Sequence, residues 1–167
     1  MSLEEMRLAQ ERVMSVYSKK PHLALSTIAT TASVEDGLFC TVHEGDYQNT
    51  TDMPVTLGGT GQAPSPGVFA RAAIASCIGI GLKMGAIRSG VDLQRVDVDL
   101  EMDFDDSAMF GISDHSAAPI STRLTIKFDS TATDEVLQRL VDTVLEIDPY
   151  FLALRDPQQV STHLKRL

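Results

Sequence analysis

The sequence predicts an α+β domain in which an antiparallel sheet surrounds a long buried central helix and a second, amphipathic helix. Residues 67–88 are almost uncharged and carry small apolar side chains, a composition typical of a helix in the centre of a domain. Residues 96–104 and 120–128 alternate apolar and polar side chains, which is the period of a strand with one buried face. Residues 133–148 carry apolar side chains at helical spacing, which predicts the second helix.

The N-terminal part predicts a separate helix followed by a hairpin. Apolar side chains recur at helical spacing within residues 3–19, and Pro21 closes that stretch. We therefore assign residues 1–20 to an N-terminal helix and residues 21–167 to a single domain. Strands are expected at residues 24–34 and 38–42, with a turn at Glu35-Asp36-Gly37 between them.

The central helix is expected to begin at Ser65-Pro66, where Ser65 suits the N-cap and Pro66 the first helical position. The two alternating strands are expected to pair antiparallel, with Asp97, Asp99, Glu101 and Asp103 facing solvent and meeting basic residues of the partner strand. We expect a long connector at residues 105–119. We also expect a capping box between Thr131 and Asp134, a second helix that ends at Pro149 and a last strand within residues 159–167.

Composition restricts the classes of partner. The formal net charge of −9 and the pI near 4.7 argue against nucleic acid and against an anionic membrane surface. The uncharged centre of the main helix, residues 72–82, is too short to span a bilayer. The chain opens without a secretory signal pattern, and its two cysteines, Cys40 and Cys77, read as reduced thiols. A cytoplasmic location is therefore expected.

The segment around Cys77 resembles the OsmC and organic hydroperoxide resistance (Ohr) superfamily from about residue 24 to the C-terminus. The resemblance rests on a glycine- and proline-rich lead-in and on the sequence around the thiol, at Gly58, Gly59, Gly61, Pro64, Pro66 and Ala75-Ser76-Cys77. It implies an OsmC-like fold, an intertwined homodimer and thiol-dependent reduction of organic hydroperoxides in the oxidative stress response. Cys77 is then the catalytic thiol.

Three other residues that this resemblance implies are replaced. The family's arginine comes from a hairpin turn, and residues 30–37 contain none; its helix-opening glutamate is Gly67 here, and its second cysteine is Asp148. The sequence thus predicts one retained thiol with weak or lost peroxidase activity, a small hydrophobic hydroperoxide as substrate and an external thiol as reductant.

Activation of Cys77 needs a group from elsewhere in the fold. Cys77 lies about three turns beyond Pro66, too far for the helix dipole to lower its pKa, and burial would raise that pKa. A carboxylate at Asp148 close to Cys77 would disfavour the thiolate further. The cationic candidates, which the sequence cannot rank, are Arg88, Arg95, Arg123 and Arg155. Arg71 lies six residues before Cys77, on another helix face.

Other interpretations stay open. The protein could be a non-enzymatic dimer that holds a small apolar ligand near the subunit interface, or a structural dimer without chemistry. Cys77 could be a small core hydrophobe, and Cys40 a packing residue or a resolving thiol. No cofactor is predicted. No metal is predicted either, because His43, Glu44 and Asp46 lack a further ligand at zinc spacing. The spacing of the acidic residues and the histidine around the connector matches no calcium-binding loop and suits a solvated loop. These residues are Asp103, Asp105, Asp106, Asp114 and His115.

Overall fold

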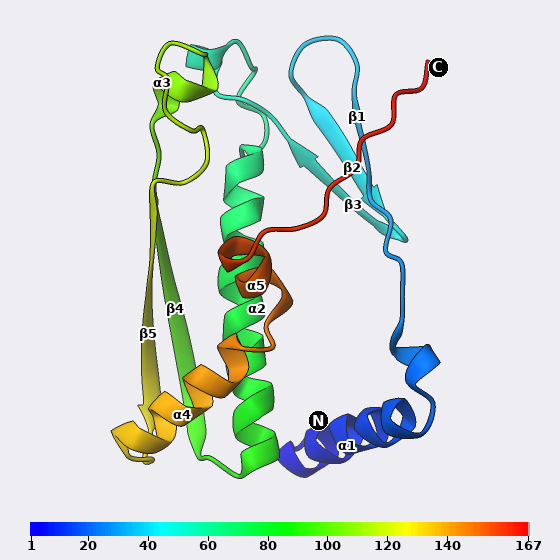
Figure 1. Cartoon of the computed structure of the whole chain (residues 1–167), viewed down its shortest axis with the longest axis vertical. Coiled ribbons are helices and arrows are strands. Elements are labelled where there is room, and N and C mark those ends of the chain that lie inside the picture. Colours follow the sequence, from blue (N-terminus) through cyan, green and yellow to red (C-terminus); the bar gives the residue numbers. More distant parts are fainter. Residues whose placement is uncertain (167) are drawn as a thin grey trace. The chain divides into compact units, whose positions relative to one another are not determined.

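The computed structural model describes residues 1–166 and contains helices and two antiparallel sheets (Figure 1), which confirms the α+β class. By its contacts the chain divides into two compact units, Met1–Ala73 and the part from Ile74 onward, which are described separately. The elements are α1 (Leu3–Lys19), η1 (Pro21–Ala24), β1 (Thr31–Val34), β2 (Cys40–Glu44), β3 (Tyr47–Thr51), η2 (Val55–Leu57), α2 (Pro66–Ser89), β4 (Leu93–Asp103), α3 (Asp106–Met109), β5 (Ser121–Ser130), α4 (Asp134–Leu145) and α5 (Pro149–Arg155).

The first unit contains α1 and a three-stranded sheet in the order β1-β2-β3. Helix α1 has the predicted bounds and opens with a capping box between Ser2 and Glu5. The predicted strand 24–34 is shorter than expected, because residues 21–24 form a 3₁₀ turn and residues 25–30 have no regular structure. Strand β3 was not predicted. It follows a turn in which Gly45 has a φ of 56°, a conformation that glycine adopts at little cost.

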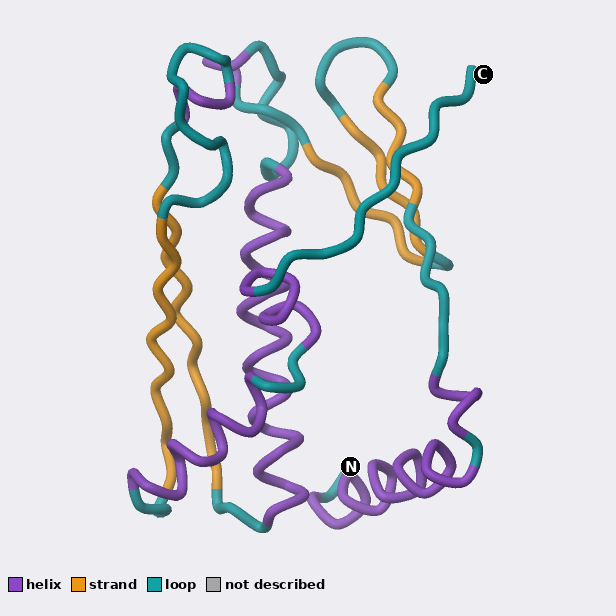
Figure 2. The backbone as a smooth tube through the Cα atoms, in the orientation of Figure 1, coloured by secondary structure: helices purple, strands orange, loops and turns teal. Residues whose placement is uncertain are grey.

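The core lies in the second unit, where α2 packs against the β4–β5 ribbon and α4 (Figures 1 and 2). Three of its buried apolar residues, Ile78, Leu82 and Ala86, come from one face of α2. The others are Leu93 of β4 and Leu140 and Val144 of α4. The apolar positions of β4 and β5 are partly buried against this cluster, as the period of two predicts.

The ribbon confirms the predicted antiparallel pairing of opposite charges. Asp97 lies opposite Lys127, and Glu101 lies opposite Arg123. Arg123 forms ion pairs with Glu101 and Asp103, and Lys127 pairs with Asp99. These pairs lie on the solvent side of the ribbon, so the other side is left for α2.

Several predicted boundaries were wrong. The connector contains a short helix, α3, with Asp105 as its N-cap. The N-cap position of α4 is Thr133 and not Thr131, its side chain makes no capping hydrogen bond, and the helix ends at Leu145. Pro149 therefore begins a helix, α5, where it was expected to end one; proline suits this first position because its missing N–H would have no partner there. Residues 159–166 form no strand, and the last residue of that predicted strand lies outside the described residues.

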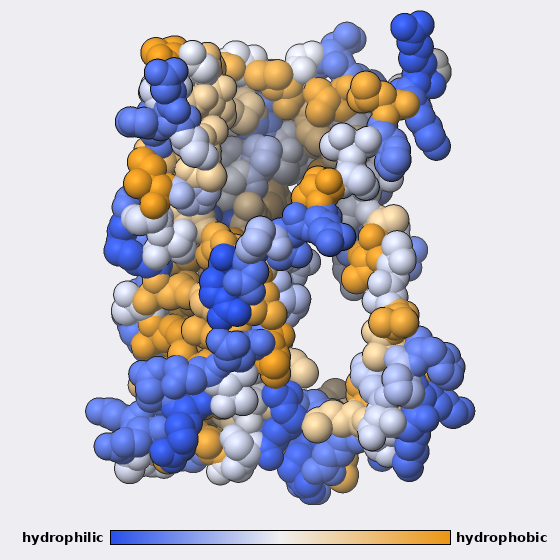
Figure 3. Space-filling view, in the orientation of Figure 1, coloured by the Kyte–Doolittle hydropathy of each residue, from blue (hydrophilic) through white to orange (hydrophobic). Residues whose placement is uncertain are grey.

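Helix α2 occupies the predicted central position, but one chain buries only one of its faces. Ile80 is 61% exposed and Met84 is 40% exposed, and apolar surface is visible in Figure 3 on the face where α2, β4 and β5 are seen in Figure 1. By length and composition alone α2 could cross a membrane. The central helix of a folded domain meets the same criteria, and here α2 packs against a ribbon and a helix. The predicted intertwined dimer stays a prediction.

Candidate functional site

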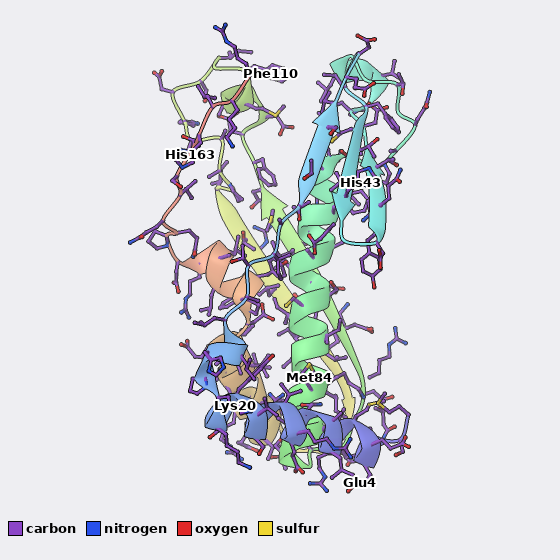
Figure 4. The ribbon with its side chains drawn as sticks, turned by 90° about the vertical axis from the view of Figure 1, so that its right-hand side faces the viewer. Glu4, Lys20, His43, Met84, Phe110 and His163 are labelled. Atoms are coloured by element: carbon purple, nitrogen blue, oxygen red, sulfur yellow. The ribbon has the colours of Figure 1, made fainter. Side chains whose placement is uncertain are left out.

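Cys77 lies partly buried in the middle of α2 and lines a cavity of about 280 Å³. The α2 residues that line it stand at positions i, i+3, i+4, i+7 and i+11, which share one face of a helix: Cys77, Ile80, Gly81, Met84 and Arg88. Figure 4 labels Met84 of this set on α2. The opposite wall comes from the end of α4 and the start of α5, with Val144, Ile147, Asp148 and Pro149. The cavity is therefore mostly apolar, with a thiol, a carboxylate and a guanidinium in its lining.

Asp148 is the buried charge of this cavity, with only 4% of its surface exposed. Its Oδ1 accepts hydrogen bonds from the backbone N–H groups of Tyr150, at 3.1 Å, and Phe151, at 2.8 Å, and so caps the N-terminus of α5. Its Oδ2 is turned to α2, 3.6 Å from the position that a Cβ atom would take at Gly81. Gly81 lies one helical turn after Cys77, so this oxygen faces the same side of α2 as the thiol.

Three effects raise the pKa of the Cys77 thiol above its ordinary value. Burial has the largest effect; the Asp148 carboxylate adds to it as a hydrogen-bond acceptor that favours the protonated thiol and as a negative charge that disfavours a thiolate. The backbone N–H of Tyr150 opposes these effects in part. Cys77 is therefore a neutral thiol near pH 7, whereas attack on a peroxide needs the thiolate.

The structure separates the arginines that the sequence could not rank. Arg95, Arg123 and Arg155 form ion pairs with carboxylates, and none of them lines the cavity of Cys77. Arg88 does line that cavity, three turns along α2 from the thiol.

Arg71 belongs to the first unit. Its Nη1 lies 3.0 Å from the Cβ position of Gly67 and thus lies over the place where the resemblance implies a glutamate.

Cys40 lies on β2 in the first unit, where its thiol donates to the backbone oxygen of Thr41. Both cysteines are free thiols. Whether Cys40 resolves an oxidised Cys77 stays open.

The acidic connector forms a network of hydrogen bonds. The Asp105 carboxylate accepts from Ser107, from Ser113 at 2.8 Å and from Nδ1 of His115 at 2.9 Å. These bonds hold the pKa of Asp105 down, to about 2. In residues 1–166 no group of three or more histidine, cysteine, aspartate or glutamate side chains could hold a metal ion.

The glycine-rich lead-in is held by a buried carboxylate that the sequence analysis missed. Asp52 is 1% exposed and accepts hydrogen bonds from the backbone N–H groups of Met53, Thr60 and Gln62 and from the Thr60 hydroxyl. The loop approaches Met53 so closely that a Cβ atom at Gly59 would lie 1.8 Å from the Met53 oxygen. The loop therefore needs glycine at this position for close backbone approach.

An apolar site near Cys77 was among the open interpretations, but its lining residues were not predicted, although the sequence carried a signal for them. Residues 80, 81, 84 and 88 share a helix face with Cys77 by their spacing alone. What the spacing could not show is that the α4–α5 junction forms the other wall.

An α+β domain with a thiol on its central helix and a glycine- and proline-rich lead-in to that helix indicates the class of protein. The family model for OsmC-like proteins matches residues 59–163, so the chain belongs to the OsmC-like family. A comparison with curated protein sequences finds no match.

Solved structures support the same assignment. An OsmC-like protein from Mycoplasma pneumoniae matches with a TM-score of 0.65 and 14% identity, over 78% of this chain and 88% of that one. An organic hydroperoxide resistance protein OsmC from Legionella pneumophila matches with a TM-score of 0.60 and 22% identity, over 78% and 90%. The organic hydroperoxide resistance protein OhrB of Bacillus subtilis matches with a TM-score of 0.51 and 19% identity, over 78% and 91%. At these identities the likeness establishes the fold.

Proposed function

We propose that this protein is an OsmC-like redox protein of the oxidative stress response in which Cys77 is the sole reactive thiol. The observation that carries the proposal is the position of Cys77 at an apolar cavity, where a small hydrophobic hydroperoxide could reach the sulfur. The raised pKa of the thiol and the carboxylate beside it make its reaction slow.

The proposed chemistry uses an external thiol in place of an internal one. The Cys77 sulfur attacks the outer oxygen of R–O–O–H, an S–O bond forms as the O–O bond breaks, and the products are a sulfenic acid and the alcohol ROH. The thiol proton ends on the alcohol oxygen. A first external thiol then gives a mixed disulfide and water, and a second one restores Cys77 and leaves as the external disulfide.

Peroxide consumption with a small thiol reductant tests this proposal. We expect slow turnover that the substitution Cys77→Ser abolishes and the matched substitution Cys40→Ser leaves in place. Mass spectrometry of the Cys77 peptide should show one added oxygen at first and a second on prolonged exposure, because the proposed cycle uses no internal thiol to resolve the sulfenic acid. Rapid turnover would contradict the slow reaction, and turnover that survives Cys77→Ser would contradict the role of Cys77.

One observation favours a second candidate function, a non-enzymatic binding protein for a small apolar ligand. The cavity is lined by Ile80, Met84, Val144 and Ile147, and its thiol is held neutral. Binding of an apolar fluorescent probe should then fall when Met84→Trp fills the cavity and should be unchanged in Cys77→Ser. If the probe binds Met84→Trp as well as it binds wild type, that result would argue against this function.

We further propose a homodimer. All fully buried apolar residues of the described chain lie in the second unit, whereas the buried residues of the first unit are the polar Thr51 and Asp52. A sheet and a helix without a core of their own need a covering surface, and a second copy would supply one. Sedimentation at micromolar concentration that shows only an 18.1 kDa species would contradict this proposal.

We propose a cytoplasmic location for this protein because both cysteines are free and a single-thiol cycle needs a reducing compartment. Fractionation of cells that express the full chain would test it. Recovery with the membrane or outside the cell would contradict it.

A further inference from the structure

We propose that Asp148 is the positioning residue that keeps the Cys77 sulfur protonated and so limits its reactivity. This inference rests on the proposed function only in taking Cys77 as the thiol that reacts. It assigns to Asp148 a task beyond the cap of α5, because its charge adds to the effect of burial on the thiol and can be removed by one substitution.

The two carboxylate oxygens of Asp148 have different partners. Oδ1 is fixed by the N–H groups of Tyr150 and Phe151, at 3.1 and 2.8 Å. Oδ2 is turned to α2, 3.6 Å from the position that a Cβ atom would take at Gly81, one helical turn after Cys77, and Asp148 and Cys77 line the same cavity. A helix cap needs one acceptor oxygen, so the second oxygen is available to the thiol.

The surroundings hold the carboxylate at this place. Asp148 is 4% exposed, so its charge is poorly screened by solvent. A Cβ atom at Gly81 would lie at an ordinary 3.6 Å from Oδ2 but at a tight 3.0 Å from Cγ1 of Val144, so glycine here lets α4 pack closely on α2 just before Asp148. A buried carboxylate with one oxygen fixed to the backbone cannot turn away from the thiol without losing the cap.

The other groups around the thiol do not replace this effect. Arg88 lines the same cavity, but three turns along α2, and the Tyr150 N–H opposes the effect of the carboxylate. The ribbon presents apolar residues to α2, with Val98 3.7 Å from the Cβ position of Gly79. The charged residues of β4 are turned to solvent, where Asp99 and Glu101 pair with β5. Asp148 is thus the charged group that, together with burial, raises the pKa of Cys77.

The same contact also affects the oxidised state. A sulfenic acid formed at Cys77 by an organic hydroperoxide carries an S–O–H group in place of S–H, and that group can donate to Oδ2 of Asp148. The carboxylate then disfavours loss of this proton as it did for the thiol. Asp148 would therefore slow both the first oxidation and the second, which converts the sulfenic acid into a sulfinic acid with a further hydroperoxide.

The test is the rate of alkylation of Cys77 by iodoacetamide as a function of pH in the full-length chain. Wild type is compared with Asp148→Asn, which keeps a side-chain oxygen for the cap and removes the charge. The matched control is Asp142→Asn, which removes an exposed carboxylate of α4. Peptide mass spectrometry follows Cys77 and Cys40 separately, so Cys40 is an internal reference in each sample.

We expect the alkylation profile of Cys77 to move to lower pH in Asp148→Asn, by about tenfold in rate at neutral pH for each unit of pKa. Cys40 in every variant and Cys77 in Asp142→Asn should be unchanged. An unchanged profile in a folded Asp148→Asn protein, or a shift to higher pH, would overturn the inference. If that variant does not fold, Asp148→Ser, another neutral capping residue, should give the same shift.

The proposed function can fail separately. Alkylation needs no hydroperoxide, so a shifted alkylation profile without any peroxide consumption would retain the role of Asp148 and contradict the redox function. Conversely, peroxide turnover that depends on Cys77 with an unchanged alkylation profile in Asp148→Asn would retain the redox function and overturn the role of Asp148.

Discussion

Gly85 of α2 lies so close to Leu140 of α4 that a Cβ atom at position 85 would be 2.9 Å from Cδ1 of that leucine. Cγ2 of Val144, one turn further along α4, would also lie 2.9 Å from that Cβ atom. Gly81 makes a similar approach to Val144, at 3.0 Å. This close packing of α4 on α2 brings the following residue pair, Asp148-Pro149, to the cavity of Cys77. The glycines of α2 therefore determine the geometry of the site as well as the stability of the core.

The substitution Gly85→Ala should destabilise the protein. The added methyl group would meet Leu140 and Val144 at 2.9 Å, and overpacking of this kind costs about 1–3 kcal/mol. Gly79→Ala in the same helix is the matched control, because its nearest neighbour is Cγ2 of Val98 at an ordinary 3.7 Å. That control should be neutral or stabilising, since alanine is favoured over glycine in a helix by about 0.5–1 kcal/mol. Urea unfolding of both variants measures this; equal stabilities would contradict the packing.

The two faces of β4 should respond differently to substitution. Val98→Asp places a charge against the core cluster and should cost on the order of 3–5 kcal/mol, as unpaired buried charges do. Asp99→Val removes only an exposed ion pair with Lys127 and should cost little. Thermal unfolding followed by circular dichroism distinguishes them. Similar losses in both variants would mean that the faces are assigned wrongly.

The sequence predicted the elements whose pattern is local. The period of two in β4 and β5 gave both strands and their inward faces, and the small apolar residues of α2 gave the central helix with Cys77 at its middle. Opposite charges at Asp97 and Lys127 gave the antiparallel pairing. These features depend on the spacing of neighbouring residues, so no knowledge of distant contacts was needed.

Features set by distant contacts were missed or misjudged. Pro149 suits a helix start as well as a helix end, and only the cap by Asp148 shows which one it is. Strand β3 is polar along most of its length, with burial confined to its last two residues, so it has no alternating signal. The buried Asp52 could not be predicted because its partners, Thr60 and Gln62, are loop residues. The carboxylate beside Cys77 could be named as a possibility, but its place in the cavity of the thiol required the structure.

The stability of the protein should fall in acid, between about pH 4 and pH 2. Hydrogen bonds from Ser107, Ser113 and His115 hold the pKa of Asp105 down, to about 2. A carboxyl group whose pKa is lower in the folded state stabilises the fold above its unfolded pKa, and this contribution is lost as pH falls through the folded value. Asp103, whose pKa Arg123 lowers, acts in the same direction.

Urea unfolding at a series of pH values measures this acid dependence. Asp105→Asn should be less stable than wild type at neutral pH. It should lose less stability between about pH 4 and pH 2, because position 105 then has no carboxyl group to protonate. Asp106→Asn, at the neighbouring position in α3, is the control and should follow wild type. Parallel curves for wild type and Asp105→Asn would contradict the assignment.

The substitution Asp148→Cys should allow a disulfide with Cys77. Position 148 lines the same cavity as Cys77, and a disulfide requires the two Cβ atoms to come within about 3.5–4.5 Å of each other. In a Cys40→Ser background, mild oxidation should then remove both alkylatable thiols, and a dithiol should restore them. Peroxide turnover with that dithiol should rise above wild type, because the sulfenic acid gains a neighbouring thiol to resolve it and Cys77 loses a negative neighbour. Loss of the cap at α5 should lower stability by about 0.5–2 kcal/mol.

Asp142→Cys, on an exposed position of α4, is the control and should form no disulfide with Cys77. If the two variants oxidise alike, or if neither does, the end of α4 does not lie against Cys77 in solution.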